Sequence, residues 1–149
     1  LGAAPGSWSQ VALEEAGATG CVVAVDKLQI KPLDNLKIIN GDFMNPNVRA
    51  SVREALGNRV IDLVLSDMAP NITCVSDIDQ ARSVGLATEA RDFALEHLRP
   101  GGRLVLKLFG GPESARFQRD TRKLFNACLV RKPYSSRPES TEFFLVARQ

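Results

Sequence analysis

The feature that most constrains this chain is the turn at residues 1–8, Leu-Gly-Ala-Ala-Pro-Gly-Ser-Trp, which is followed by a helix-compatible run to Ala16. Glycine permits positive φ and close approach of the backbone to a ligand, and Ser7 is of a type that caps helices. Because helix N-termini attract polar groups, the pattern predicts a strand-to-helix turn beside a nucleotide-like ligand. The strand that leads into such a turn is not in the chain, so we expect an N-terminal segment to precede Leu1.

Short apolar runs alternate with amphipathic runs along the chain, which favours an α/β fold with a mostly parallel, doubly wound sheet. The last two expected strands have no helix between them, so a hairpin should add one antiparallel strand. Such a mixed sheet is usual in S-adenosylmethionine-dependent methyltransferases, and the 149 residues suit a single domain. The expected helices are 7–17, 47–56, 80–98 and 114–126, and the expected strands are 21–25, 36–40, 60–65, 103–109, 128–131 and 143–147.

Three local signals place the ends of these helices. Asn47 is expected to cap the second helix and Gly57 to end it. The Pro-Gly-Gly sequence at residues 100–102 is expected to stop the long third helix before the next strand.

The net charge of +2 conceals an asymmetry between two parts of the chain. Residues 1–98 contain 8 Lys/Arg and 13 Asp/Glu, whereas residues 99–149 contain 11 and 4. The basic C-terminal third predicts a polyanionic partner, although a solvated basic helix face is an equal alternative. The cysteines (Cys21, Cys74 and Cys128) form neither a disulfide framework nor a metal-binding pattern, so we expect no metal and a reducing compartment.

Acidic residues follow three successive expected strands. Asp26 lies 20 residues after Gly6, where an acid accepts hydrogen bonds from an adenosine ribose. Asp42 and the adjacent Phe43 could contact an adenine amine and ring, and Asp67 follows the next strand. Each acid alone could simply cap a turn, but the set predicts a cofactor site. The G-x-x-x-G spacing of the turn disfavours NAD and favours S-adenosylmethionine.

The segment 66–71, Ser-Asp-Met-Ala-Pro-Asn, together with 3–10, Ala-Ala-Pro-Gly-Ser-Trp-Ser-Gln, resembles the FtsJ/RrmJ family of RNA ribose 2′-O-methyltransferases. Residues 105–109 and 132–142 agree with the same family. The wording of 66–71 resembles the branch that modifies a uridine of large-subunit ribosomal RNA in bacteria and mitochondria. A mitochondrial location is therefore expected, with the bacterial cytoplasm as the alternative.

The resemblance implies a Lys-Asp-Lys-Glu catalytic set, of which Asp67, Lys107 and Glu142 are in this chain. The first lysine normally precedes the glycine turn. Lys107 would be the general base, and the two acids would orient it, with Asp67 also near the cofactor. Without the resemblance, Lys107 would read as a strand-end lysine that extends to water. The implied cofactor-binding residues are Pro5, Gly6, Ser7, Trp8, Asp26, Asp42, Phe43 and Asp67. For the ring of Trp8, packing of its helix onto the sheet is favoured over contact with the ligand.

Basic residues of the C-terminal third are candidates for RNA-phosphate contacts. Tyr134 could stack on a base or pack at the root of its loop. The competing hypotheses are a non-catalytic RNA-binding or ribosome-assembly module and, less favoured, an NAD-dependent oxidoreductase. We expect a monomer whose partner is ribosomal RNA or the large ribosomal subunit. The RNA-binding candidates are Arg116, Arg119, Lys123, Arg131, Lys132 and Arg137.

Overall fold

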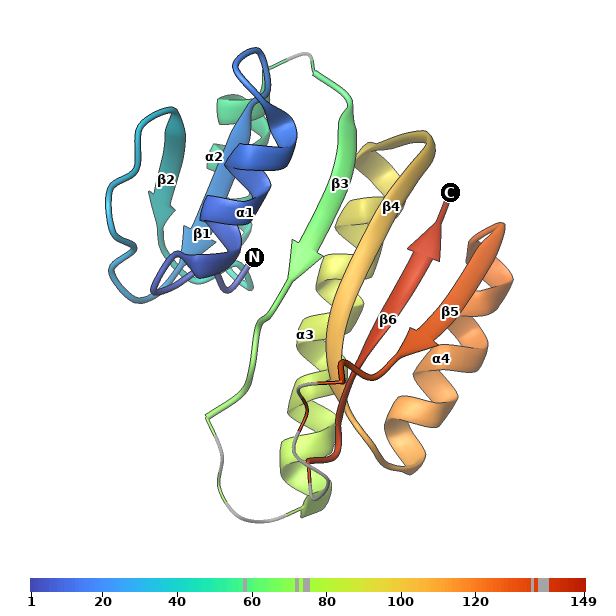
Figure 1. Ribbon diagram of the computed structural model, residues 1–149. Coiled ribbons are helices and arrows are strands. Elements are labelled where there is room, and N and C mark those ends of the chain that lie inside the picture. Colours follow the sequence, from blue (N-terminus) through green and yellow to red (C-terminus); the bar gives the residue numbers. More distant parts are fainter. Residues whose placement is uncertain (58, 72, 74–75, 135, 137–139) are drawn as a thin grey trace. The chain divides into compact units, whose positions relative to one another are not determined.

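The computed structural model describes residues 1–57, 59–71, 73, 76–134, 136 and 140–149. The chain divides into two compact units, residues 1–59 and 60–149 (Figure 1). Cys74 and Arg137, singled out in the sequence, lie outside the described residues. No described helix has the length and apolar character needed to cross a membrane.

Unit 1 is a pair of parallel strands with two helices. Strand β1 (Val22–Asp26) pairs with β2 (Leu36–Asn40) in parallel. Helix α1 (Ser7–Ala16) contacts β1, and α2 (Pro46–Leu56) contacts both strands. Asp26 therefore ends β1, as the sequence predicts.

The helices of unit 1 begin one or two residues away from the expected caps. Gly6 is the N-cap of α1 with φ 128°, and Ser7 makes no capping bond, so the prediction for Ser7 is wrong. The prediction for Asn47 is also wrong, because Asn45 caps α2 by accepting a bond from Asn47 N (2.9 Å). Pro46 explains the second shift, since proline suits the first helical position and moves the cap before it.

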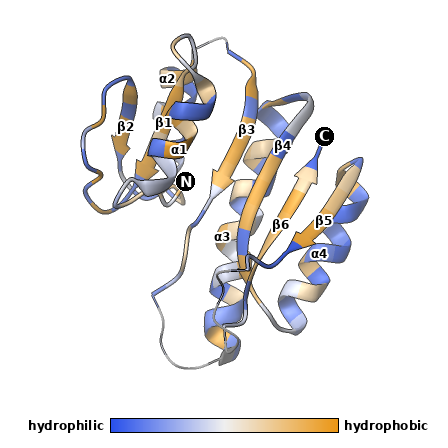
Figure 2. Ribbon diagram, viewed as in Figure 1, coloured by the Kyte–Doolittle hydropathy of each residue, from blue (hydrophilic) through white to orange (hydrophobic). Residues whose placement is uncertain are grey.

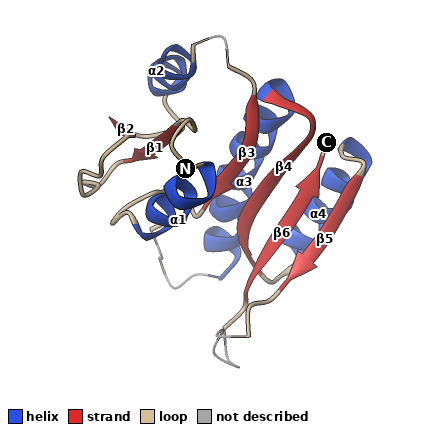
Figure 3. Ribbon diagram, turned by 45° about the horizontal axis from the view of Figure 1, so that its top comes forward, coloured by secondary structure: helices blue, strands red, loops and turns tan. Residues whose placement is uncertain are grey.

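Unit 2 is a four-stranded mixed sheet in the order β3-β4-β6-β5. Strand β6 runs antiparallel to both neighbours, which confirms the predicted antiparallel strand, whereas β3 and β4 are parallel. Both helices of the unit cover the same face of this sheet (Figures 1 and 3). The elements are β3 (Ile61–Ser66), α3 (Ser76–His97), β4 (Leu98–Phe109), α4 (Pro112–Leu124), β5 (Ala127–Arg131) and β6 (Glu142–Arg148).

Alternation along β4 separates the core from the site. Leu104, Leu106 and Leu108 are fully buried and point toward the helices, as the period of two in a strand requires. The intervening Val105 and Lys107 point to the opposite face, which we call the open face because no described helix of this unit covers it. Figure 2 shows these strands as the most hydrophobic part of the unit.

The long helix ends within one residue of the predicted position, but the Pro-Gly-Gly segment at 100–102 lies inside the next strand instead of before it. Helix α3 ends at His97, and β4 begins at once and contains the segment. Ile61 pairs with Leu98 but Leu63 with Arg103, so the segment forms a bulge of β4. Gly101 there has φ 77°, a conformation that favours glycine.

Candidate active site

Lys107 is the centre of the polar cluster on the open face. Its Nζ lies 2.7 Å from Asp67 Oδ1 and 4.0 Å from Glu142 Oε1. The side chain of Lys107 is only 14% exposed. The structure therefore brings together the three predicted catalytic residues, and it excludes the alternative of a lysine that extends to water.

Three neighbouring strands build this cluster. Asp67 directly follows the last residue of β3, and Ser66 at that end pairs with Leu106 of β4. Glu142 begins β6 and pairs with Phe109 of β4. Because all three side chains come from strand ends held by backbone ladders, their spacing is set by sheet register. The cluster has one ammonium and two carboxylates, so it favours an additional positive group beside it.

The glycine turn of unit 1 is held against the end of β1 by backbone bonds. Gly2 N and Ala3 N both donate to Val25 O (2.9 and 3.1 Å), and Lys31 N donates to Pro5 O (3.2 Å). Pro5 and Ser7 are exposed, Gly6 is buried and Trp8 is half-buried. The first turn of α1 has no side-chain cap, so it is suited to polar groups of a ligand.

Asp26 ties this turn to β1. Its Oδ2 accepts a hydrogen bond from Ala4 N (2.9 Å) and its Oδ1 one from Leu28 N (2.8 Å). The carboxylate therefore caps a turn, which the sequence analysis gave as the alternative to a role in cofactor binding. A carboxylate has about four acceptor positions, so it retains capacity for ribose hydroxyls.

Asp42 forms a salt bridge with Lys27 (2.8 Å), and its Oδ1 accepts a bond from Met44 N (2.9 Å). The hydrogen bond from Lys27 holds the pKa of Asp42 below its usual value. Phe43 is 3% exposed, so its ring belongs to the core and its contact with adenine stays a prediction. Sequence reasoning missed Lys27, because nothing in the local pattern signals a pair across the strand ends.

These residues fit a methionine-adenosyl cofactor. Asp26 has free acceptor positions beside an uncapped helix start, and an acid follows the second strand of the unit. The uncapped helix start can donate hydrogen bonds to the amino acid part of such a molecule. Asp26 can accept hydrogen bonds from its ribose.

Of the basic residues predicted to bind RNA, the five that the structure describes are exposed, but several have polar or acidic neighbours. Lys123 pairs with Asp120 (2.8 Å), and this contact lowers the pKa of Asp120, with weaker contributions from Arg116 and Arg119. Lys132 Nζ donates to Ser140 O, and Arg131 Nη1 to Val130 O. Tyr134 is fully exposed, which excludes the packing alternative.

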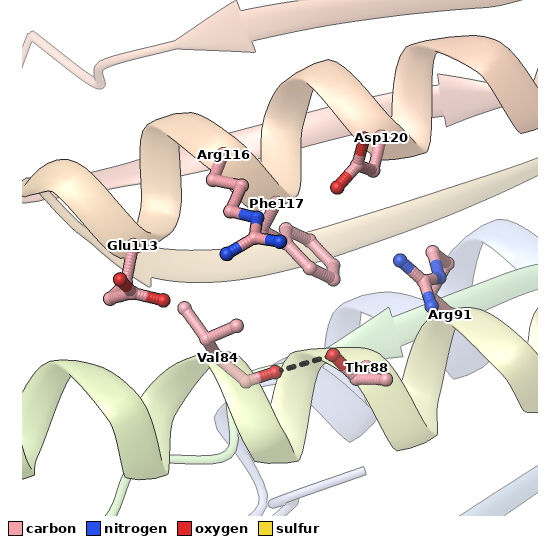
Figure 4. Close-up of a pocket in the computed structure, with 7 residues that line it drawn as sticks. All are labelled: Val84, Thr88, Arg91, Glu113, Arg116, Phe117 and Asp120. Atoms are coloured by element: carbon pink, nitrogen blue, oxygen red, sulfur yellow. Dashed lines mark hydrogen bonds between the residues drawn. The ribbon is translucent and has the colours of Figure 1, made fainter.

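A hollow of about 190 Å³ lies between α3 and α4 (Figure 4). Arg91 lies over the Phe117 ring there, 5.1 Å from its centroid. The lining has two arginines and two acids, and none of the predicted catalytic residues. Its residues are Val84, Thr88, Arg91, Glu113, Arg116, Phe117 and Asp120.

Comparison with known proteins agrees with this arrangement. A protein named ribosomal RNA large subunit methyltransferase E from Azoarcus sp. (strain BH72) is 44% identical over 146 residues, covering 98% of this chain and 71% of the relative. Its namesake from Halorubrum lacusprofundi is 47% identical over 150 residues, covering 99% and 56%. The crystal structure of a protein described as a ribosomal RNA methyltransferase from Plasmodium falciparum has a TM-score of 0.85 at 25% identity, covering 99% and 82%.

The α/β fold and the lysine–carboxylate cluster thus occur in a chain similar to RNA-modifying enzymes. Residues 1–149 match the model of the FtsJ-like methyltransferase family, and the chain belongs to that family. This confirms the predicted class, an S-adenosylmethionine-dependent methyltransferase. The fold, but no more, is shared with a Streptococcus mutans methyltransferase solved with SAH (TM-score 0.56, 13% identity, 98% of this chain and 82% of that chain).

Proposed function

We propose that this protein transfers a methyl group from S-adenosyl-L-methionine to a ribose 2′-hydroxyl of RNA, and that the target is a uridine of large-subunit ribosomal RNA. The observation that carries the proposal is the position of Lys107, held at 2.7 Å by Asp67 and near Glu142 at strand ends. The names of the relatives support the ribosomal substrate.

The chemistry requires that a poor nucleophile lose its proton. A ribose hydroxyl is essentially un-ionised at neutral pH, so a nearby group must accept the proton as the oxygen attacks. In the proposed mechanism the Lys107 ammonium first releases a proton to solvent, and its neutral Nζ then takes the hydroxyl proton. Asp67 and Glu142 hold the amine in position and balance the charge that it acquires.

The cofactor supplies an electrophilic methyl group on a positively charged sulfonium. Asp26 would hold its ribose, Asp42 would accept from the adenine amine, and the backbone of Pro5–Trp8 would hold its amino acid part.

The two relatives named ribosomal RNA large subunit methyltransferase E come from a bacterium and an archaeon, which supports the cytoplasmic alternative for this protein. A mitochondrial location has no support from these relatives and stays a prediction. The monomeric state also stays a prediction.

The direct test is transfer of labelled methyl to large-subunit ribosomal RNA and to whole subunits, with nucleoside analysis of the product. We expect 2′-O-methyluridine, and a fall of about 10²–10⁴ in kcat for Lys107→Ala because general-base catalysis is lost. Cofactor affinity, measured by calorimetry, should stay within a few-fold.

Arg82→Ala is a matched control, because it removes an exposed cation from α3, the helix that covers the opposite face of the sheet. Full activity of Lys107→Ala would contradict the mechanism. RNA binding without any turnover by the full-length protein would support a non-catalytic assembly module instead.

A further inference from the structure

Two arginines lie directly opposite each other on the open face of unit 2. Arg103 of β4 pairs in register with Arg148 of β6, and both are exposed. Like charges in this position destabilise a sheet because their Cβ atoms are only about 5 Å apart. Within the described residues, no hydrogen bond or ion pair offsets the charge of either side chain.

The bulge of β4 adds a third arginine to this pair. Arg99 Nη1 and Arg148 Nη2 each lie 3.7 Å from the position that a Cβ on Gly101 would occupy. Arg99 is paired with Asp62 (2.5 Å). Two guanidinium groups, those of Arg99 and Arg148, thus lie beside Gly101, and Arg103 lies opposite Arg148 in register.

This arginine group differs from the basic face of α4. There, Lys123 forms an ion pair with Asp120, and Arg116 also interacts electrostatically with Asp120. Glu113 lies about one helical turn before Arg116. Around Arg103 and Arg148 the positive charge is in excess. The residues that flank them in register, Leu63 and Ala127, are uncharged.

Position on the sheet relates the group to Lys107. Arg103 and Lys107 are four residues apart on β4, so both point to the open face about 13 Å apart. A short stretch of nucleotide chain spans that distance. An arginine pair without acidic partners is suited to bidentate recognition of phosphate.

We propose that Arg103 and Arg148, assisted by Arg99, form a phosphate-binding site that holds the RNA backbone a few nucleotides from the methylated ribose. The inference rests on the proposed function, which it deepens by assigning a second contact with the RNA. The repulsion between the paired arginines is relieved when phosphate binds between them.

The test measures binding of an in-vitro-transcribed large-subunit ribosomal RNA fragment by the full-length protein without cofactor, over a series of salt concentrations. For R103Q/R148Q we expect the negative slope of log K against log salt to become shallower by about 1.4, at 0.7 per phosphate contact. R53Q/R82Q is the charge-matched control, since both residues are exposed and lie elsewhere, and its slope should equal that of the wild type. R103K/R148K should recover most of the slope.

Two further measurements separate this role from a structural one. In turnover, R103Q/R148Q should raise KM for RNA about tenfold or more with kcat unchanged. Without RNA, Arg148→Gln alone should raise Tm by about 1–2 °C, because it relieves the like-charge pair.

The proposal is overturned if folded R103Q/R148Q has the same salt slope as the wild type. It is also overturned if this variant loses binding of inorganic phosphate but still binds RNA as the wild type does, because the site would then hold free phosphate and not the RNA backbone. If the double variant does not fold, Arg148→Gln decides, with an expected loss of about 0.7 in slope. Because binding is measured without cofactor, absence of methyl transfer by the wild type would reject the proposed function but leave this test valid.

Discussion

The two units use carboxylates in opposite ways. In unit 1, Asp26 bonds to backbone N–H groups of its own turn and Asp42 bonds to a backbone N–H and to Lys27. In unit 2, Asp67 and Glu142 converge on one amine from two different strands. The first arrangement holds loops in the shape needed for a ligand, and the second holds a reactive group. Substitutions should therefore affect binding and stability in unit 1 but turnover in unit 2.

Among the carboxylate substitutions, the largest effect should come from Asp67→Ala. Lys107 would lose its nearest partner, and we expect kcat to fall by about 10²–10³, within the range for impaired general-base catalysis. The experiment is steady-state methyl transfer at saturating cofactor. Glu142→Ala should cost less, since its oxygen lies 4.0 Å from the amine. The control is Asp77→Ala, which removes an exposed carboxylate at the start of α3 and should leave kcat unchanged. A kcat for Asp67→Ala within threefold of the wild type would contradict the distinction between the units.

Asp26→Ala should have an intermediate effect and act on binding. Lost bonds to the cofactor ribose should raise its Kd roughly 10- to 100-fold, and lost bonds to Ala4 N and Leu28 N should cost about 1–2 kcal/mol of stability. Calorimetry and thermal denaturation measure both quantities. Asp34→Ala, an exposed acid of the same unit, should change neither. If Asp26→Ala lowers kcat but leaves the Kd unchanged, the assignment of Asp26 to binding is wrong.

The smallest effect concerns Lys27 and Asp42, whose side chains are 65% and 41% exposed. The pKa of Asp42 is lowered in the folded state from its usual value of 3.8. The pair with Lys27 therefore stabilises the protein fully at pH values above 3.8. That stability is lost as pH falls through the lower folded pKa. Lys27→Met should lower stability by less than about 1 kcal/mol at pH 7, and the difference in Tm should vanish at a pH below the folded pKa of Asp42, where its carboxyl is protonated. A difference that persists there would show that Lys27 acts through packing.

Local patterns predicted most elements and the strand-end acids, because hydrophobic period and strand length depend on neighbouring residues. The same local signals failed at the caps Ser7 and Asn47 and at the Pro-Gly-Gly segment. That segment is typical of a helix stop, but pairing of Leu98 with Ile61, 37 residues earlier, makes it a bulge. The opposition of Arg103 and Arg148 likewise depends on strand register, which the sequence does not encode locally.

The position of β6 between β4 and β5 has a consequence for synthesis of the protein. Among the described strands, β5 pairs only with β6, although it precedes β6 in the chain. During translation, β5 must therefore wait for the later strand before it can join the sheet. The same strand carries Glu142 and Arg148. We expect nascent chains that lack β6 to have neither a complete lysine–carboxylate cluster nor the arginine pair, so that function develops only after β6 has joined the sheet.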